Sequence, residues 1–294
     1  SEIRFTIDHG ISCLIYAADG RMVRARTVVA ATGGLAAPAF GCDGSGFELL
    51  KRHGHVCSPL FPALVQIRTE TDLVRGLAGI KFDGSARLRI NGDPVRTESG
   101  EILFAEYGLS GPPVFDLSRE ISEALQSRPP RQVEIVLDFL PDMDHQALLS
   151  WLHERRQSDM DLPMADFLTG LVVKKLGQAL LKRCLAQQLT LASPVSMLTD
   201  TELERLAEML KELPLRVVGT LGWQHAQTTA GGLVTGDFDS SSLRSRFQPG
   251  LFAAGEILDV DGDCGGYNLQ WAWSSGHLAG SGAMKTALGQ EPGM

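Results

Sequence analysis

Residues 251–276 read LFAAGEILDVDGDCGGYNLQWAWSSG, and this stretch predicts how the end of the chain folds. A short apolar run ends at Gly255-Glu256, a loop rich in glycine and aspartate follows, and a helical segment begins at Tyr267. This order predicts a buried parallel strand that delivers a carboxylate to a ligand, with the next helix pointing its N-terminus at the same ligand. Free N–H groups at that helix start favour an anionic or electron-rich partner. The alternative interpretation is a strand, a turn and a packed helix without a ligand.

The composition limits the classes of protein to consider. The 294 residues suffice for one large domain or two ordinary ones, and 44% hydrophobic with 21% charged residues is typical of a globular protein. A net charge of −8 argues against a nucleic-acid partner. No apolar run reaches the roughly 20 residues of a membrane span and no signal-peptide pattern opens the chain, so we expect no membrane partner and a cytoplasmic location. The five cysteines form no C-x-x-C pair, which favours a reducing compartment.

The two ends of the chain differ from its middle in the style of their strands. Near the N-terminus the pattern predicts strands at 3–7 and 12–17, a turn at Asp19-Gly20, and then one strand buried on both faces over 24–31. Strand-like sequence returns at 215–223 and 251–254. These segments favour a single α/β unit made from both ends of the chain.

The middle of the chain alternates short strands with turn signals. Strands are expected at 64–68, 86–90, 94–97 and 102–105, with turns at 83–84, 91–92 and 99–100, and a further strand at 133–139. Such spacing predicts a small antiparallel sheet or barrel. Helical patterns follow at 146–155, 164–185 and 203–213, the last with a capping box at Thr201-x-x-Glu204. The expected domains are therefore 1–58 and 215–294 as two parts of one domain, with 59–214 inserted between them.

Three glycine-rich turns follow candidate parallel strands. They are Thr32-Gly33-Gly34, Thr229-Ala-Gly231-Gly232, and Gly255-Glu256 together with Gly265-Gly266. Each is a weak signal alone, but ligands of open α/β sheets bind beyond the carboxyl ends of the strands, so the combination indicates one site. No G-x-G-x-x-G follows an N-terminal strand in this sequence, so the usual pyrophosphate cradle is absent from it.

Several motifs occur in the order found in one bacterial flavoprotein family. They are Ala31-Thr-Gly-Gly34, Gly44-Ser-Gly46, Tyr107-Gly-Leu-Ser-Gly-Pro112, Thr229-Ala-Gly-Gly232 and Ala254 to Gln270. Over essentially its whole length the chain resembles this family, whose members are described as aminoacetone oxidases, dehydro-bile-acid-reductase-like proteins or NAD(P)/FAD-dependent oxidoreductases. The resemblance implies an α/β fold, with a Rossmann-like FAD-binding domain interrupted by a small β-barrel and a helical piece. Family members begin with a strand and G-x-G-x-x-G that hold the ADP half of FAD, so we expect this domain to be truncated at its N-terminus here.

The resemblance also implies which residues lie at the cofactor. Thr32, Gly33 and Gly34 would lie beside FAD, and Gly255 and Glu256 would end the C-terminal strand, with Glu256 near the ribityl chain or pyrophosphate. The helix whose N–H groups face the pyrimidine edge of the flavin would begin with Gly266, Tyr267, Asn268, Leu269 and Gln270. A helix N-terminus stabilises the negative charge that a reduced flavin carries near N1 and O2. Gly231, Gly232 and Gly265 complete the expected cofactor-binding set, and no residue is identified as catalytic.

The leading functional hypothesis is an FAD-dependent oxidoreductase that acts on a small organic substrate, with NAD(P)H as a candidate electron donor. The alternative is a truncated or degenerate family member that has lost its cofactor and serves as a binding or scaffold module. A nicotinamide-only dehydrogenase is less favoured, because Glu256 follows a C-terminal strand and not a glycine fingerprint. His53 and His55 lack the further ligands of a metal site, and Cys264 is more often an inert residue than a redox partner. The oligomeric state stays open.

Overall fold

The computed structural model describes residues 4–8, 12–16 and 21–290, so the turn expected at Asp19-Gly20 lies outside the described residues. The chain divides into two compact units. Unit 1 comprises the described residues up to Leu64 and from Gly222 onward, and unit 2 comprises Val65–Leu221. Among the described residues, no helix has both the length and the apolar character needed to cross a membrane.

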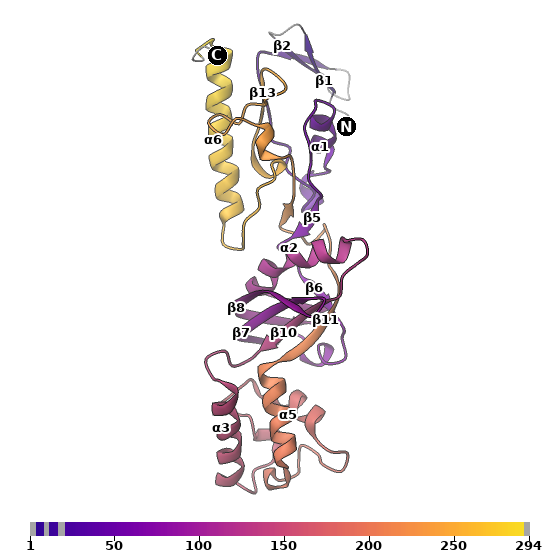
Figure 1. Ribbon diagram of the computed structural model, residues 1–294, viewed down its shortest axis with the longest axis vertical. Coiled ribbons are helices and arrows are strands. Elements are labelled where there is room, and N and C mark those ends of the chain that lie inside the picture. Colours follow the sequence, from indigo (N-terminus) through magenta and orange to yellow (C-terminus); the bar gives the residue numbers. More distant parts are fainter. Residues whose placement is uncertain (1–3, 9–11, 17–20, 291–294) are drawn as a thin grey trace. The chain divides into compact units, whose positions relative to one another are not determined.

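Unit 1 combines short sheets with a long C-terminal helix (Figure 1). Its elements are β1 (Arg4–Asp8), β2 (Ser12–Tyr16), β3 (Met22–Ala25), β4 (Val28–Ala30), η1 (Pro38–Phe40), α1 (Ser45–Lys51), β5 (Phe61–Ala63), β12 (Thr228–Ala230), η5 (Thr235–Asp237), β13 (Leu251–Ala253), η6 (Gly255–Ile257) and α6 (Tyr267–Ala287). β1, β2 and β3 form one antiparallel sheet, β5 pairs antiparallel with β12, and β4 pairs parallel with β13. α6 packs against β4 and β13, over a core that includes Phe47, Phe252 and Ile257.

The single strand expected over 24–31 is two strands in the structure. β3 pairs with β2 whereas β4 pairs with β13, so the chain leaves one sheet and enters another between Ala25 and Val28. The expectation that both faces are buried is also wrong. Ala30 is 7% exposed but Val29 is 36% exposed, because successive side chains of a strand point to opposite faces and the core covers one of them.

Unit 2 is built on a closed β-barrel with the strand order β10-β11-β6-β9-β8-β7. Its elements are β6 (Ile67–Thr69), η2 (Arg75–Leu77), β7 (Lys81–Ile90), β8 (Asp93–Ala105), β9 (Gly108–Ser110), α2 (Pro112–Gln126), β10 (Val133–Asp138), α3 (His145–Ser158), η3 (Met164–Asp166), α4 (Lys174–Cys184), η4 (Val195–Met197), α5 (Asp200–Lys211) and β11 (Leu213–Thr220). The barrel confirms the small antiparallel sheet or barrel predicted for the middle of the chain. α2 packs against β7 and β8, and α5 packs against both α3 and α4 (Figure 1).

Only one of the three glycine turns expected in the barrel is a turn. Asn91-Gly92 joins β7 to β8 with φ values of 55° and 91°, the positive values that a tight hairpin needs. Gly84 and Gly100 instead lie inside the strands, opposite one another in the β7–β8 ladder. A Cβ on Gly84 would meet the carbonyl oxygen of Asp138, and one on Gly100 would press on Pro113. These two glycines therefore allow neighbouring segments of the chain to approach closely, and the strands continue through them.

The helical part of unit 2 differs from the expected pattern at two places. The helix expected over 164–185 is the short η3, a loop and then α4; Gly170, with φ of 92°, lies between them. The capping box is present two residues before the expected position. Thr199 accepts from the N–H of Glu202, whose carboxylate accepts from the N–H of Thr199.

Strand pairing explains why the units end where they do. β5 pairs with β12, so residues 61–63 stay with unit 1, although the sequence boundary was placed after residue 58. β11 pairs with β6 and β10, so it closes the barrel and stays with unit 2, although the sequence boundary was placed after residue 214.

Candidate functional site

The three glycine-rich turns of unit 1 meet at one place. Thr229 lies at the centre: its hydroxyl accepts hydrogen bonds from the N–H groups of Leu35 at 2.8 Å and Ala36 at 3.0 Å. Its own N–H donates to Oε1 of Glu256 at 2.8 Å. A Cβ on Gly34 would run into both the Thr229 side chain and Oε1 of Glu256. Only glycine therefore fits at position 34, where the turns after β4, β12 and β13 pack on one another.

Side chains of α6 hold the loop that leads into this helix. The amide of Asn268 donates to the carbonyl of Gly262 at 2.8 Å and accepts from its N–H at 2.9 Å. The hydroxyl of Ser275 accepts from the N–H of Gly255 at 2.9 Å, and the indole of Trp271 donates to the carbonyl of Gly255 at 3.2 Å. The loop is thus fixed at both ends by the helix that it precedes.

The N-terminus of α6 has no side-chain cap in the described chain. Its N-cap residue is Gly266, with φ of 91°, and no side chain accepts from the first N–H groups of the helix as a cap. A Cβ at Gly266 would have no atom within 4 Å, so the helix start faces open space. An uncapped start of a 21-residue helix concentrates positive partial charge at that point.

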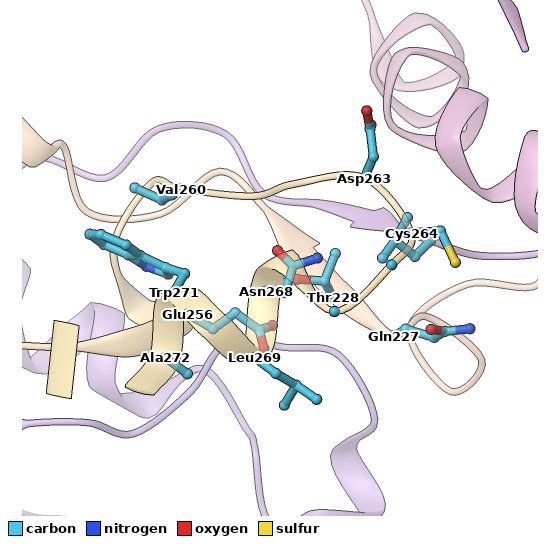
Figure 2. Close-up of a pocket in the computed structure, with 13 residues that line it drawn as sticks. Gln227, Thr228, Glu256, Val260, Asp263, Cys264, Asn268, Leu269, Trp271 and Ala272 are labelled. Atoms are coloured by element: carbon cyan, nitrogen blue, oxygen red, sulfur yellow. The ribbon is translucent and has the colours of Figure 1, made fainter. Parts of the chain in front are cut away.

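A pocket of about 330 Å³ lies at this helix start (Figure 2). Both apolar and polar side chains line it, which is typical of small-molecule sites. The pocket is lined by Leu64, Gln227, Thr228, Glu256, Val260, Asp263, Cys264, Gly265, Gly266, Asn268, Leu269, Trp271 and Ala272. Every one of these residues belongs to unit 1.

Thr228 is the one pocket residue in the described chain whose buried polar side-chain atom has no hydrogen-bond partner. Thr228 is 1% exposed, and so is the neighbouring Thr229, whose hydroxyl accepts from two backbone N–H groups. A buried hydroxyl without a partner is costly, and such groups in folded proteins call for a specific explanation.

The expected cofactor residues divide into two groups in the structure. The pocket includes Glu256, Gly265, Gly266, Asn268 and Leu269. The residues that do not line it are Thr32, Gly33, Gly34, Gly231, Gly232, Gly255, Tyr267 and Gln270. Several of these support the turns: a Cβ on Gly33 would meet Cys42, one on Gly231 would meet the carbonyl of Pro59, and one on Gly232 would meet the backbone of Asp259. The side chain of Gln270 hydrogen-bonds to Ser274, one turn along the helix.

Sequence reasoning missed four polar or aromatic groups at the pocket: Gln227, Thr228, Asp263 and Trp271. A signal for Thr228 was present, because it directly precedes the Thr229-Ala-Gly-Gly motif, but nothing in the sequence distinguishes the role of one threonine from that of the next. Cys264 also lines the pocket. Within the described ranges, no group of three or more potential ligand side chains is placed to hold a metal ion.

Comparison with known proteins assigns the family. The family described as HI0933-like protein barrel and H2TH domain matches residues 61–228, which contain the whole closed barrel and helices α2 to α5. The chain belongs to the HI0933-like family. The match covers the barrel and helices of unit 2 and reaches β12, but not the remainder of the pocket.

Three relatives are similar to this HI0933-like chain over most of its length. A 3-dehydro-bile acid delta(4,6)-reductase of Clostridium scindens is 36% identical over 266 residues, 90% of this chain and 64% of the relative. Ribosomal RNA dihydrouridine synthases of Escherichia coli and Haemophilus influenzae are 32% and 29% identical over 87% and 86% of the chain, and 60% and 59% of the relatives. The chain thus spans about three fifths of the length of these curated relatives.

The two ribosomal RNA enzymes correct one expectation. The net charge of −8 had argued against any nucleic-acid partner, yet relatives at 29–32% identity are named for ribosomal RNA. That inference was wrong because a net charge sums over both units of the HI0933-like chain and does not report on the charge of a local contact surface.

Proposed function

We propose that the chain is the flavin-facing part of an FAD-dependent oxidoreductase. The observation that carries the proposal is the uncapped start of α6 at a pocket that is also lined by Glu256, whose carboxylate accepts from the N–H of Thr229 where the glycine turns meet. An electron-rich ring edge is what an uncapped helix N-terminus stabilises. The similarity to a reductase supports the same reaction class.

The residues of the pocket fit a flavin. The free space at Gly266 admits a ligand edge to the backbone of α6, and the Thr228 hydroxyl offers a buried polar contact. Val260, Leu269 and Trp271 would place apolar surface against the ring. A bound flavin would supply hydride or electron transfer, while the protein binds, orients and tunes it. Glu256 holds the β12 turn in place through its bond to Thr229.

We further propose that unit 1 is the Rossmann-like FAD-binding domain, interrupted by the barrel and helices of unit 2. The parallel pairing of β4 with β13 supports this, because it joins segments from both ends of the sequence into one unit. Helix α6 packs on that parallel pair, as helices do in α/β folds.

The names of the relatives support reduction as the direction of the reaction. One relative is named as a delta(4,6)-reductase and two are named for a dihydro product, so each name denotes addition of hydrogen. We propose a small unsaturated molecule as the substrate, with NAD(P)H as the electron donor. Reduction of uridine in RNA, and none of small unsaturated compounds, would overturn this choice of substrate.

Flavin titration tests the proposal. The chain, and the longer protein that contains it if there is one, are titrated with FAD, FMN and riboflavin while flavin fluorescence is recorded. We expect saturable quenching, and a protein that turns yellow and is bleached by a reductant. A protein that neither binds nor retains any of the three flavins would contradict the proposal and favour the cofactor-free binding module.

A further inference from the structure

We propose that the hydroxyl of Thr228 is a ligand contact that hydrogen-bonds to the polar edge of the flavin's pyrimidinedione ring. The inference rests on the proposed function and deepens it, since Thr228 is not among the expected cofactor-binding residues. The site would take a planar ring whose edge carries carbonyl oxygens and a ring N–H.

The first support is the state of the hydroxyl. Thr228 is 1% exposed and lines the pocket, and within the described residues its Oγ1 has no hydrogen-bond partner. Folding that strips water from a hydroxyl without replacing its hydrogen bonds is unfavourable. Thr228 is one of the residues that line the pocket (Figure 2).

The second support is the contrast with the adjacent residue. Thr229 has the same side chain and the same 1% exposure, but its hydroxyl accepts from the N–H groups of Leu35 and Ala36. Successive residues of a strand point to opposite faces, so β12 presents one threonine to the packed turns and the other to the pocket. Thr229 therefore supports the fold, while the hydroxyl of Thr228 has no such role.

The third support is the chemistry on the other side of the pocket. The uncapped N-terminus of α6 offers donors only, whereas a threonine hydroxyl both donates and accepts. A pyrimidinedione edge alternates carbonyl acceptors with a ring N–H donor. Helix N–H groups match the carbonyl oxygens, and Thr228 can match either kind of group.

The pair of isosteric variants Thr228→Val and Thr229→Val tests the inference with readouts that do not depend on activity. The first readout is the melting temperature of each chain without ligand. We expect Thr228→Val to melt at or above the wild-type temperature, because valine removes an unpartnered polar group. Thr229→Val should melt below it. A fall for Thr228→Val like that for Thr229→Val would overturn the inference, since the hydroxyl would then have a partner within the fold.

The second readout is the dissociation constant for riboflavin, which carries the ring without phosphate, measured by fluorescence quenching. We expect Thr228→Val to raise it about five- to tenfold, as the loss of one hydrogen bond does. An unchanged constant, with the wild type binding, would overturn the inference alone. A wild type that binds no flavin would overturn both the inference and the proposed function.

Uridine, titrated as a competitor, distinguishes the two sources of a pyrimidinedione edge. We expect riboflavin to remain bound in its presence. Binding of uridine in place of riboflavin would show that Thr228 faces a substrate ring, and would overturn the assignment of this contact to the flavin.

Discussion

At the scale of single residues, the two neighbouring threonines of β12 show how burial alone fails to define a role. Both are 1% exposed, yet the hydroxyl of Thr229 joins two turns of the fold, whereas that of Thr228, a residue that lines the pocket, has no partner among the described residues. Removing a partner from buried N–H groups costs more than removing a hydroxyl that has none.

Thr229→Val is therefore expected to lower the free energy of unfolding by about 2–3 kcal/mol, because the N–H groups of Leu35 and Ala36 would lose their acceptor. Denaturant unfolding followed by circular dichroism measures the change. Gly34 would lose its fixed neighbour as well, so flavin binding should also weaken. A loss of stability no larger than that of Thr228→Val would contradict this role of the hydroxyl.

His55 is a second residue whose role is decided by the groups that surround it. Its Nε2 lies 3.0 Å from the hydroxyl of Ser245, and its Nδ1 lies 3.7 Å from Oδ2 of Asp237. The order Ser–His–Asp is that of a hydrolase triad, but the Ser245 hydroxyl already accepts from the N–H groups of Phe247 and Gln248. That hydroxyl is buried, so the arrangement is structural. The ring of His55 stacks on Phe238 at 4.6 Å.

Stability is expected to fall as the pH drops below about 6.5, the ordinary pKa of histidine. Burial lowers the pKa of His55, Asp237 opposes that shift, and the nearby His53 adds to it. Since the folded state binds the proton more weakly than the unfolded state, the contribution is complete above the unfolded pKa. This contribution of His55 to stability is lost as the pH falls toward the pKa of His55 in the folded state. Melting temperatures between pH 8 and pH 5, roughly the range in which histidine titrates, measure it. His55→Phe should flatten this dependence, and an equally steep decline in that variant would contradict the prediction.

At the scale of elements, α6 shows two kinds of glycine in one helix. Gly282 lies where the helix packs on the core: a Cβ there would come within 3.0 Å of Ser242 and Phe252. Gly276 has nothing within 4 Å of such a Cβ. Inside a helix, alanine is preferred to glycine wherever it fits.

The pair Gly282→Ala and Gly276→Ala should therefore change stability in opposite directions. Gly276→Ala is expected to raise the free energy of unfolding by about 0.5–1 kcal/mol through helix propensity. Gly282→Ala is expected to lower it by about 1–3 kcal/mol, because overpacking forces the helix away from β13. Urea unfolding of both variants provides the comparison. A stabilising Gly282→Ala would show that the helix contact is looser than the structure has it.

At the scale of the whole molecule, the described chain has two hydrophobic cores that share no residue. The core of unit 2 is formed by one continuous segment of chain, with the barrel strands paired only among themselves. The core of unit 1 depends on both ends of the sequence, through the pairs β4–β13 and β5–β12.

A fragment comprising residues 65–221 is therefore expected to fold alone and to unfold in one cooperative transition. A fragment comprising residues 222–290 should not, because β12 and β13 would lose their pairing partners. Circular dichroism during heating measures both. A broad, non-cooperative transition of the 65–221 fragment would show that its barrel needs the rest of the chain.

Local patterns predicted part of this fold and failed where a neighbour distant in sequence decides. The hairpin at Asn91-Gly92 was predictable, because its positive φ values are a local demand that those residues meet. Gly84 and Gly100 were mistaken for turns because a glycine required by close packing looks the same in sequence as a glycine required by a turn. The helix expected over 164–185 failed for a similar reason, since its apolar spacing continues across the break at Gly170.

The sequence by itself determined the local elements: the strand 251–253, the glycine loop, the start of α6 at Tyr267, and the alternation of strands and turns that makes the barrel. It did so because dihedral preference and hydrophobic periodicity act over a few residues. Only the tertiary structure decided that Gly34, Thr229 and Glu256 meet, and that Thr228 and not Thr229 faces the pocket. Hydrogen-bond partners and cavities depend on segments nearly 200 residues apart, such as Leu35 and Thr229, which no local pattern records.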